Sequence, residues 1–510
     1  MNSLPLLSLT IFAPWLGAAV LGLFRFSSNS ARNVALAFSF TTLLLAGPLL
    51  STFDPSTTGL QWVERHAWIP SLNVAYHLGL DGLSLLLVLL TGIIAPMALF
   101  ASRNEVSDPR AFHILFLLLQ GAALGVFLAL DFFHWFIFWE ISLIPAFFLI
   151  KLWGGGSKRR NGTAATSAAY QFVLYTIGGS AFMLAGFAAL FATTGTLDFT
   201  QLAALRADGT LTTQLSDTWA WIIFAGVLLG LAVKVPLFPF HTWLPSTYAE
   251  APTGVSMFLT AVMSKMGLYG FLRILWPLFP AELHAIATPL LWLALGGVVL
   301  GAFAALRQTD LKRMIAYSSI NHLSYCLLAL FAVASAAQPS PAAAAAAFSG
   351  TLLQMFNHGL SAAALFFCIG ILETRSGGLR GLNDFGGVRT AMPVFAGLCG
   401  IAMFSSLGLP GLNGFIGEFL IFRGVWGFAP CAAAIAMLGL FATALFLLTF
   451  WQRVFQGPQR GAVASFADLS KQELVVLLPA IALMFVLGLY PQLIIRLFNP
   501  LITQWASSLP

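Results

Sequence analysis

Long apolar runs, most of them about twenty residues in length, follow one another along the whole chain. A transmembrane helix needs about 20 such residues to cross a hydrocarbon core of about 30 Å. The strands of a transmembrane barrel would be segments of about ten residues with alternating apolarity. The pattern therefore predicts an all-α polytopic membrane protein with about 14 transmembrane helices. The predicted spans are 4–24, 32–50, 78–100, 111–130, 132–152, 165–193, 218–242, 252–277, 283–306, 313–337, 343–372, 391–425, 429–452 and 472–496.

Composition excludes a soluble globular protein. The 510 residues are 59% hydrophobic and 8% charged, whereas soluble domains have about 45–50% and 25%. The loops are too short for a soluble domain, so 1–510 is expected to form a single membrane domain. We expect no strands and find no glycine-rich phosphate loop, which argues against nucleotide chemistry on this chain. No basic region precedes the first span, and we expect a retained helix there.

Basic residues are distributed unequally between the two sides of the predicted bundle. Arginine and lysine accumulate in loops that are not translocated. The even-numbered loops and the C-terminal end hold Arg65, Arg206, Arg273, Arg423 and Arg496. The odd-numbered loops and their margins hold Arg25, Arg32, Arg103, Arg110, Lys151, Lys158, Arg159, Arg160, Arg307, Lys312, Arg313, Arg375, Arg380, Arg389, Arg453, Arg460 and Lys471. We therefore expect odd-numbered loops in the cytoplasm and both termini on the opposite side. This bias accounts for the net charge of +6, so no nucleic-acid partner is expected.

Helix breakers interrupt two of the predicted spans. Span 7 contains Pro236 and Pro239, and span 12 contains the run LGLPGLNGFIGE at 407–418. The two breaks lie five spans apart, which suggests two five-helix repeats with the fourth helix of each broken. The repeats would be 111–277 (spans 4–8) and 283–452 (spans 9–13). Because five is odd, the second copy would enter the membrane from the opposite side as an inverted repeat.

Four ionisable residues lie inside apolar spans, namely Glu140, Lys234, Lys265 and Glu418. Such residues are costly in a bilayer and usually mark ion or proton pathways. A purely structural role remains the alternative for each, for example a buried Glu140–Lys234 pair. Buried pairs often fail to stabilise a protein relative to apolar substitutes, which favours a functional reading. Lys265 is also too deep in its span to snorkel easily to the surface.

Two histidines in spans 10 and 11 extend this set of candidates. His322 and His358 each follow an asparagine. A lone histidine in an apolar helix is more often a core residue, so both readings stay open. His241 and Tyr317 are weaker candidates for the same relay.

The remaining charged residues and the cysteines suggest no further chemistry. Seven charged residues lie at span ends, where head groups or neighbouring subunits can satisfy them: Glu250, Arg273, Arg307, Lys312, Arg313, Glu373 and Arg375. The cysteines fall within spans and lack the paired spacing that binds zinc or an iron–sulfur cluster. They are Cys326, Cys368, Cys399 and Cys431. We expect no metal on this chain.

Several motifs give the chain a resemblance to a known family. The longest is LAVKVPLFPFHTWLP at 231–245, followed by EAPT at 250–253. Others are WIP at 68–70, GLDGLS at 79–84, YSSINH at 317–322, HGLSAA at 358–363, GLPG at 408–411 and GEF at 417–419. They resemble the antiporter-like subunits of respiratory complex I, the proton-pumping NADH:quinone oxidoreductase, and they are spread over nearly the whole chain.

The resemblance implies roles for the buried charges. In that family a Glu in span 5 pairs with a Lys in span 7, a Lys in span 8 is the central proton carrier, and a Glu in span 12 leads to the exit. By motif these are Glu140, Lys234, Lys265 and Glu418, with His322 and His358 on the connecting polar axis.

The resemblance also implies partner subunits, and the sequence departs from the family pattern at one position. NADH, flavin, iron–sulfur clusters and quinone would lie on other membrane and peripheral subunits, with no cofactor on this chain and a lipid bilayer around it. The location would be the bacterial inner membrane. Gln171 departs from the pattern, since many members have a lysine there, so no role in proton entry is carried over to span 6.

The resulting hypothesis is a proton-translocating subunit driven by redox chemistry on other subunits. The alternatives are a subunit of a multisubunit sodium/proton antiporter, a membrane subunit of a hydrogenase complex, and a purely structural scaffold. Proton movement driven by a sodium gradient without a redox substrate would favour the first alternative. Co-purification with nickel-containing subunits would favour the second, and pumping that survives apolar replacement of the buried charges would favour the scaffold.

Overall fold

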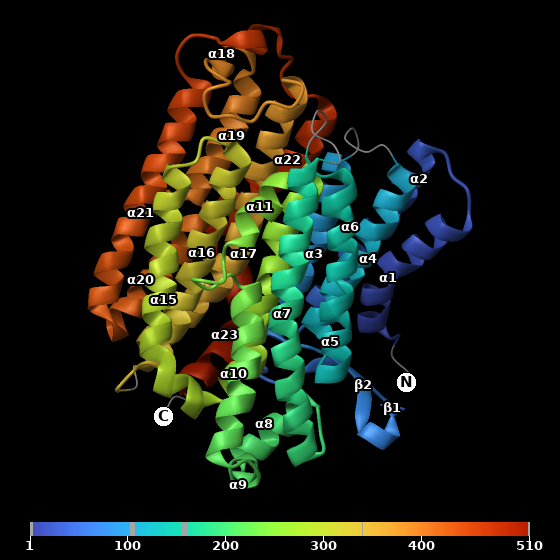
Figure 1. The fold of residues 1–510 in the computed structure, drawn as a ribbon, viewed down its shortest axis with the longest axis vertical. Coiled ribbons are helices and arrows are strands. Elements are labelled where there is room, and N and C mark those ends of the chain that lie inside the picture. The colour runs from blue at the N-terminus through green and yellow to red at the C-terminus, as the bar shows by residue number, and fades with distance from the viewer. Residues whose placement is uncertain (1–3, 103–107, 156–161, 339, 508–510) are drawn as a thin grey trace.

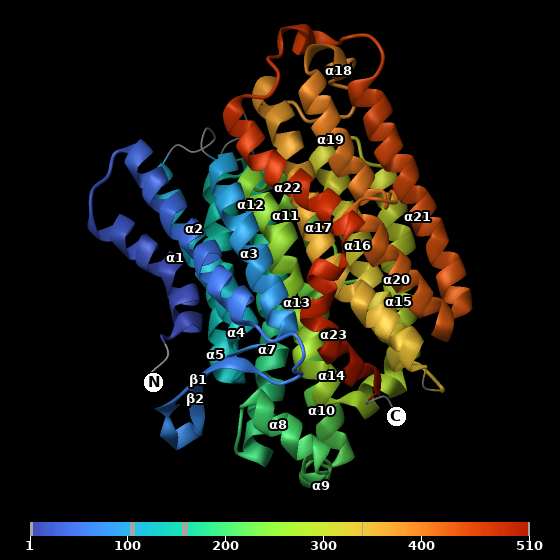
Figure 2. The ribbon, with the colours of Figure 1, turned by 180° about the vertical axis from the view of Figure 1, so that it is seen from behind.

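The computed structural model describes residues 4–102, 108–155, 162–338 and 340–507. Long helices run side by side through the molecule from the end that carries α18 to the end that carries α8 and α9 (Figure 1; Figure 2). In the described residues, 13 helices are long and apolar enough to cross a membrane. The remaining predicted span, span 12 at 391–425, is divided into two shorter helices, α19 and α20. The all-α polytopic fold is thus confirmed. Arg103, Lys158, Arg159 and Arg160 lie outside the described residues.

The N-terminal part contains three spans and a small sheet. Its elements are α1 (Leu6–Leu23), α2 (Ser28–Thr52), β1 (Gln61–Ile69), a 3₁₀ turn (Pro70–Leu72), β2 (Val74–Leu80) and α3 (Gly82–Ala101). The two strands form an antiparallel hairpin, so the expectation of no strands was wrong. Register shifts fall between Gln61 and Glu64 and between Ala67 and Ile69. Such bulges break the strict alternation by which a strand is recognised in a sequence.

The central part contains spans 4–8. Its elements are α4 (Pro109–Leu128), α5 (Phe132–Ile141), α6 (Leu143–Trp153), α7 (Thr163–Thr194), α8 (Phe199–Ala207), α9 (Thr210–Gln214), α10 (Asp217–Lys234), α11 (Trp243–Glu250), α12 (Thr253–Phe258), a π segment (Leu259–Met263), α13 (Ser264–Gly270), a second π segment (Phe271–Leu275) and α14 (Trp276–Leu278). Span 5 is interrupted at Ser142, which the sequence pattern did not predict. The Ser142 hydroxyl donates to the Trp139 carbonyl at 2.6 Å. Local bonds of this kind compete with the regular helix and bend it.

The C-terminal part contains the remaining spans. Its elements are α15 (Pro280–Leu306), α16 (Leu311–Ala334), α17 (Pro341–Arg375), α18 (Val388–Ala391), α19 (Pro393–Ser406), α20 (Asn413–Phe428), α21 (Pro430–Phe450), a π segment (Trp451–Phe455), a 3₁₀ turn (Gly461–Ser465), α22 (Lys471–Leu489) and α23 (Gln492–Ser507). The predicted span 472–496 ends earlier, at Leu489. The separate helix α23 buries Leu497 and Phe498 against the bundle. Its backbone approaches α3 so closely that a Cβ at Gly82 would lie 2.3 Å from the Leu497 carbonyl oxygen.

Both predicted breaks occur where the helix breakers lie. In span 7, α10 ends at Lys234 and α11 begins at Trp243. Because prolines donate no hydrogen bond, carbonyls at the end of α10 need other partners. The Trp243 indole donates to the Val233 carbonyl at 3.0 Å, and the Leu237 N–H donates to the Ala232 carbonyl at 2.9 Å. The break thereby satisfies these two backbone carbonyls inside the bundle, as a membrane requires.

The break in span 12 is built on glycine. Gly408 and Gly411 have φ values of +80° and +93°, which a residue with a side chain rarely adopts. The Leu409 N–H donates to the Phe404 carbonyl at 3.0 Å, and the chain then enters α20. These turns place Asn413 and Glu418 at the level of the bundle core, where both are buried.

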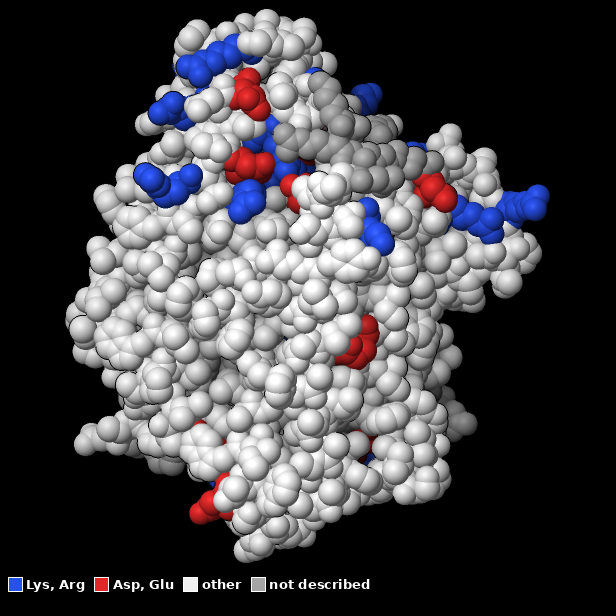
Figure 3. All heavy atoms as spheres, in the orientation of Figure 1, with Lys and Arg blue, Asp and Glu red and all other residues white. Residues whose placement is uncertain are grey.

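Charge gathers at one end of the molecule. Lys and Arg side chains surround the end that carries α18, and few appear along the rest of the visible surface (Figure 3). Both chain ends lie toward the opposite end, on the side of α8 and α9 (Figure 1). The long apolar sides between these ends are those of a multi-pass membrane protein.

Candidate functional site

Lys265 lies in the middle of the bundle and is fully buried. It sits on α13, the short α-helical segment between the two π segments of span 8. Its ammonium donates to the Thr260 carbonyl at 2.7 Å and to the Ser264 hydroxyl at 3.2 Å. It also lies 2.8 Å from Nδ1 of His358 on α17. All three partners are neutral acceptors, so no carboxylate among the described residues pairs with this lysine.

His358 leads on to His322 and Glu418. The rings of the two histidines are 5.3 Å apart between centroids. Nδ1 of His322, on α16, is 3.2 Å from Oε1 of Glu418 on α20. The structure thus brings together four of the six predicted residues. We call Lys265, His358, His322 and Glu418 the axial cluster.

Glu140 and Lys234 form no hydrogen bond or ion pair with the axial cluster among the described residues, although α10 packs on α13, where a Cβ at Gly267 would lie 3.0 Å from the Val235 backbone nitrogen. The sequence predicted a direct pair, but Oε1 of Glu140 and Nζ of Lys234 have no hydrogen-bond partner in the described part of the chain. The Lys234 ammonium instead lies 4.9 Å from the centre of the Trp139 ring and 5.8 Å from that of Phe172. Cation–π contacts can hold a desolvated ammonium. The lysine is therefore held mainly by aromatic faces.

Uncharged residues complete the site, and charge-based reasoning missed them. Gln354 on α17 donates to Nδ1 of His322 at 3.2 Å. Ser406, at the end of α19, lies 3.3 Å from Nε2 of the same ring. Gln354 is four residues before His358, so both point to one helix face. That spacing is the signal by which the sequence could have identified it. The weaker candidate His241 stacks on Phe238 at the break of span 7.

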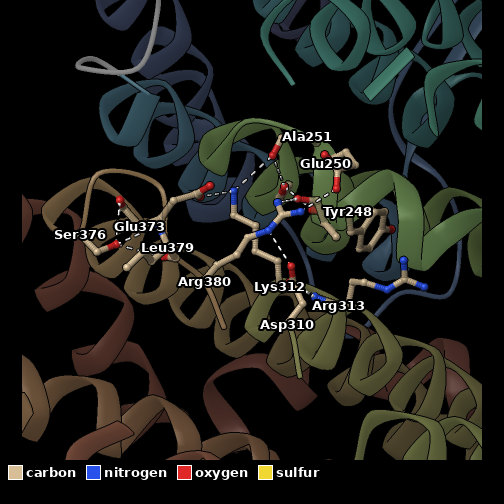
Figure 4. A network of polar contacts seen from close by, with 12 residues as sticks. Tyr248, Glu250, Ala251, Asp310, Lys312, Arg313, Glu373, Ser376, Leu379 and Arg380 are labelled. Atoms are coloured by element: carbon tan, nitrogen blue, oxygen red, sulfur yellow. Dashed lines mark hydrogen bonds and ion pairs between the residues drawn. The ribbon is translucent and has the colours of Figure 1, made fainter. Parts of the chain in front are cut away.

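A second buried group of charges lies at the end of the bundle that carries α18. Lys312 pairs with Glu373 at 2.7 Å, and Arg380 pairs with Glu250 at 2.6 Å and with Asp310 at 2.6 Å. We call these five residues the ionic clamp (Figure 4). The clamp joins α11 to the beginning of α16 and the end of α17. Burial would lower the pKa of Arg380, but the Asp310 and Glu250 carboxylates outweigh it and raise that pKa.

Most of the seven charged residues at span ends are satisfied within the chain. Arg273 pairs with Asp81 at 2.6 Å, and Arg375 pairs with Glu473 at 2.8 Å. Glu250, Lys312 and Glu373 belong to the ionic clamp. These five therefore need no head group or neighbouring subunit, which refines the prediction that lipids or other subunits satisfy them.

At the opposite end, a smaller polar group holds the β-hairpin against the bundle. Asp198 caps α8, is hydrogen-bonded to His77 at 2.8 Å and forms an ion pair with Arg65 at 3.2 Å. Burial would raise the pKa of Asp198, but hydrogen bonds from His77 and Thr200 lower it to about 2. Burial raises the pKa of Asp131, which caps α5, to about 6, although backbone N–H groups of Ala75 and Phe133 donate to it.

The sequence and fold of the chain are similar to those of known proteins. Residues 129–445 match the family model "NADH:quinone oxidoreductase/Mrp antiporter, TM", and residues 24–130 match "NADH-ubiquinone oxidoreductase chain 4, amino terminus". A solved structure, respiratory complex I from Thermus thermophilus with bound NADH, contains a chain with a TM-score of 0.86 and 29% identity, covering 99% of this chain and 100% of that one. The Mrp complex from Dietzia sp. shares the fold at a TM-score of 0.81 and 21% identity, covering 100% of this chain and 98% of that one.

The broken helices, the buried axial charges and these matches define an antiporter-type membrane subunit. NADH-quinone oxidoreductase subunit M of Rhodobacter capsulatus is 34% identical over 97% of this chain and 95% of its own length. The chain belongs to the family of NADH-quinone oxidoreductase subunit M, an antiporter-like subunit of a proton-translocating oxidoreductase complex. Other subunits of respiratory complex I are therefore its partners.

Proposed function

We propose that protons cross the membrane domain through the axial cluster, from Lys265 through His358 and His322 to Glu418. The observation that carries this proposal is the 2.8 Å contact between the Lys265 ammonium and Nδ1 of His358. The ammonium can give one proton to that nitrogen, leaving a neutral amine and a cationic ring. A carrier works best when both of its protonation states are accessible, and neutral partners favour neither state as strongly as a carboxylate would.

Glu140 and Lys234 act on this path from a distance. Neither is bonded to the axial cluster in the described residues, and both the Lys234 ammonium and Oε1 of Glu140 lack a hydrogen-bond partner there. A change in the charge of this pair would alter the electrostatic potential at Lys265, because interactions in a low dielectric extend over long distances. Redox chemistry on other subunits, which would carry NADH, flavin, iron–sulfur clusters and quinone, would drive that change.

The charge distribution supports an orientation of the chain in the membrane. The end rich in Lys and Arg would face the cytoplasm and both termini the periplasm, in the inner membrane of a bacterium with lipid along the apolar sides. No nucleic acid takes part. Residues 111–277 and 283–452 would form two inverted repeats. In support, the chain runs toward the α18 end as it passes from α10 to α11, whereas it runs away from that end as it passes from α19 to α20 (Figure 1).

The test is Lys265→Met in membranes that contain the assembled complex. We expect NADH-driven proton pumping to be lost while assembly, measured on the same samples, is retained. Lys234→Ala and Glu140→Gln should also abolish pumping with assembly intact. Normal pumping by Lys265→Met would overturn the path, and proton movement driven by a sodium gradient without NADH would overturn its coupling to redox chemistry.

A further inference from the structure

Ser180 holds the aromatic ring that lies against Lys234. It is a buried serine on α7, the helix that packs against both α5 and α10. The Trp139 indole donates to its hydroxyl at 2.9 Å. The centre of the same ring lies 4.9 Å from the Lys234 ammonium. The N–H edge of the ring is thus held by Ser180, while its face holds the lysine.

The chemistry of the two groups fixes the direction of this hydrogen bond. The indole N–H is a donor only, so the Ser180 oxygen must accept. The single hydroxyl hydrogen of Ser180 therefore remains for another acceptor. In the described part of the chain, no backbone carbonyl takes that hydrogen. The Thr176 hydroxyl, one turn earlier on α7, differs in this respect, because it donates to the Phe172 carbonyl at 2.7 Å and to the Val173 carbonyl at 3.2 Å.

Glu140 supplies an acceptor for the hydroxyl hydrogen. It directly follows Trp139 on α5, and its carboxyl group interacts with the Ser180 hydroxyl. Its Oε1 atom is buried and has no hydrogen-bond partner among the described residues. A charged acceptor makes a stronger hydrogen bond than a neutral one. Ser180 can therefore accept from the indole and donate to the carboxylate at the same time.

This arrangement connects the charge of Glu140 to the ring. Consecutive hydrogen bonds polarise and strengthen one another. A hydroxyl that donates to a carboxylate is therefore a better acceptor for the indole N–H. Protonation makes the Glu140 carboxyl group a weaker acceptor and removes that polarisation. The Trp139 ring is then held less firmly against Lys234.

Close packing of α7 against α10 sets Ser180 beside Lys234. A Cβ at Gly179 would lie 3.1 Å from Cβ of Val233. A Cβ at Gly230 would lie 3.0 Å from the Gly179 carbonyl oxygen. The two helices therefore approach each other most closely at the residues that directly precede Ser180 and Lys234.

We propose that Ser180 is a positioning residue that couples the charge of Glu140 to the ring that holds Lys234. The proposal rests on the proposed function, because the charge of this pair matters only if it governs protons in the axial cluster. It explains how the two residues act together without a direct bond. No proton passes through Ser180, since only the strengths of its two hydrogen bonds change.

The test is Ser180→Ala in the complete complex, reconstituted in liposomes. Alanine removes the hydroxyl with little change in volume. We expect the rate of NADH-driven pumping per assembled complex to fall roughly two- to tenfold, the change in an equilibrium that one ordinary hydrogen bond produces. Thr176→Val is the matched control, because it removes a buried hydroxyl from the same helix that is bonded only to that helix. Pumping in Thr176→Val should be unchanged.

Double variants test each bond of Ser180 separately. Trp139→Phe keeps a ring but has no N–H, so adding Ser180→Ala should lower pumping no further. Glu140→Asp keeps the charge but withdraws it from Ser180 by one methylene. It should lower pumping about as much as Ser180→Ala, and the two changes together should do no more than either alone. Effects within one network are non-additive in this way, whereas those of independent residues add.

Three outcomes would overturn the proposal. The first is normal pumping in Ser180→Ala. The second is an equal loss in Thr176→Val, which would indicate a packing role alone. The third is an additive loss in either double variant, or complete loss in Glu140→Asp, which would show that Glu140 acts through another contact. Lys265→Met separates these failures from failure of the path. Lost pumping in Lys265→Met beside normal pumping in Ser180→Ala would keep the path and remove only the role of Ser180.

Discussion

The ionic clamp and the axial cluster are both made of buried charged side chains, but they satisfy those charges differently. In the clamp, each charged group meets an opposite charge at 2.6–2.7 Å. In the axial cluster, Lys265 has neutral partners, and Oε1 of Glu418 and Nε2 of His358 have no hydrogen bond in the described residues. A group with an opposite charge beside it is held in one protonation state. Under the proposed function, the neutral partners of Lys265 would let it change charge more easily than the paired residues of the clamp, although Oε2 of Glu250 in the clamp also has no hydrogen bond among the described residues.

The largest expected effect on stability comes from breaking the clamp. Lys312→Met leaves Glu373 buried without its partner, which should cost about 3–5 kcal/mol. We expect a marked loss of assembled complex on native gels, with pumping per assembled complex retained. Lys265→Met should retain assembly but lose pumping, so the two lysine variants can be compared directly. Equal assembly of both variants would contradict the distinction between the two groups.

Replacing the whole pair sharpens the same comparison. The double variant Lys312→Met/Glu373→Leu removes both charges, and well-packed apolar residues often replace a buried pair without loss of stability. We expect recovery of most of the assembly lost in Lys312→Met, measured on the same gels. Assembly as low as in the single variant would indicate that the clamp has a role that apolar packing cannot fill.

Trp139→Leu tests how Lys234 is held. The indole face lies 4.9 Å from the ammonium, and such a contact contributes about 0.5–2 kcal/mol. We expect lower pumping with nearly normal assembly, whereas Trp139→Phe, which keeps an aromatic face, should retain more of the pumping. Equal pumping in the two variants would show that the ring face does not matter.

The smallest expected effect concerns the β-hairpin. The pKa of Asp131 is about 6 in the folded chain, above the about 3.9 of an unfolded aspartate. The folded state therefore binds more protons between these values, and its stability falls as the pH rises from about 4 to 6. Hydrogen exchange at 61–80, corrected for its intrinsic pH dependence, should be slower at pH 5 than at pH 7.

Asp131→Asn provides the control for that measurement. Asparagine also caps helices but does not titrate, so the difference between pH 5 and pH 7 should shrink. The contribution of Asp198 to stability has the opposite pH dependence, because its pKa of about 2 lies below that of an unfolded aspartate. Its contribution is present above about pH 4 and is lost only as the pH falls toward 2. An undiminished difference in Asp131→Asn would assign the effect to another group.

Most of the fold could be predicted from the sequence because each span must hide its backbone from lipid. Apolar runs therefore located the spans, and prolines and glycines located both breaks. The hairpin was missed because its bulges disturb the alternation of residues 61–69. The bend at Ser142 depends on one hydroxyl–carbonyl bond. Helix α22 ends at Leu489, and α23 begins at Gln492, directly after Pro491. The apolar stretch continues across this boundary and concealed it.

The site was only half predictable for a related reason. Ionisable residues are conspicuous in an apolar span, so the sequence predicted all six candidates, whose role in proton transfer stays a prediction. Their partners are uncharged and come from distant segments, as with Gln354 and Ser406 around His322. The direct Glu140–Lys234 pair was expected from the resemblance, whereas the structure places an aromatic ring against the lysine. Contacts between helices depend on side-chain geometry that spacing does not encode.

The two π segments beside Lys265 have a consequence for how the chain can lose or gain residues. A π turn holds about one residue more than the α turn that replaces it. Deleting one residue within Leu259–Met263 or Phe271–Leu275 would thus restore a regular α-helix while the flanking faces keep their orientation. A deletion elsewhere in an α-helix would rotate every later residue by about 100°. Single-residue gaps between relatives in this span should therefore fall on either side of the lysine, in these two five-residue windows.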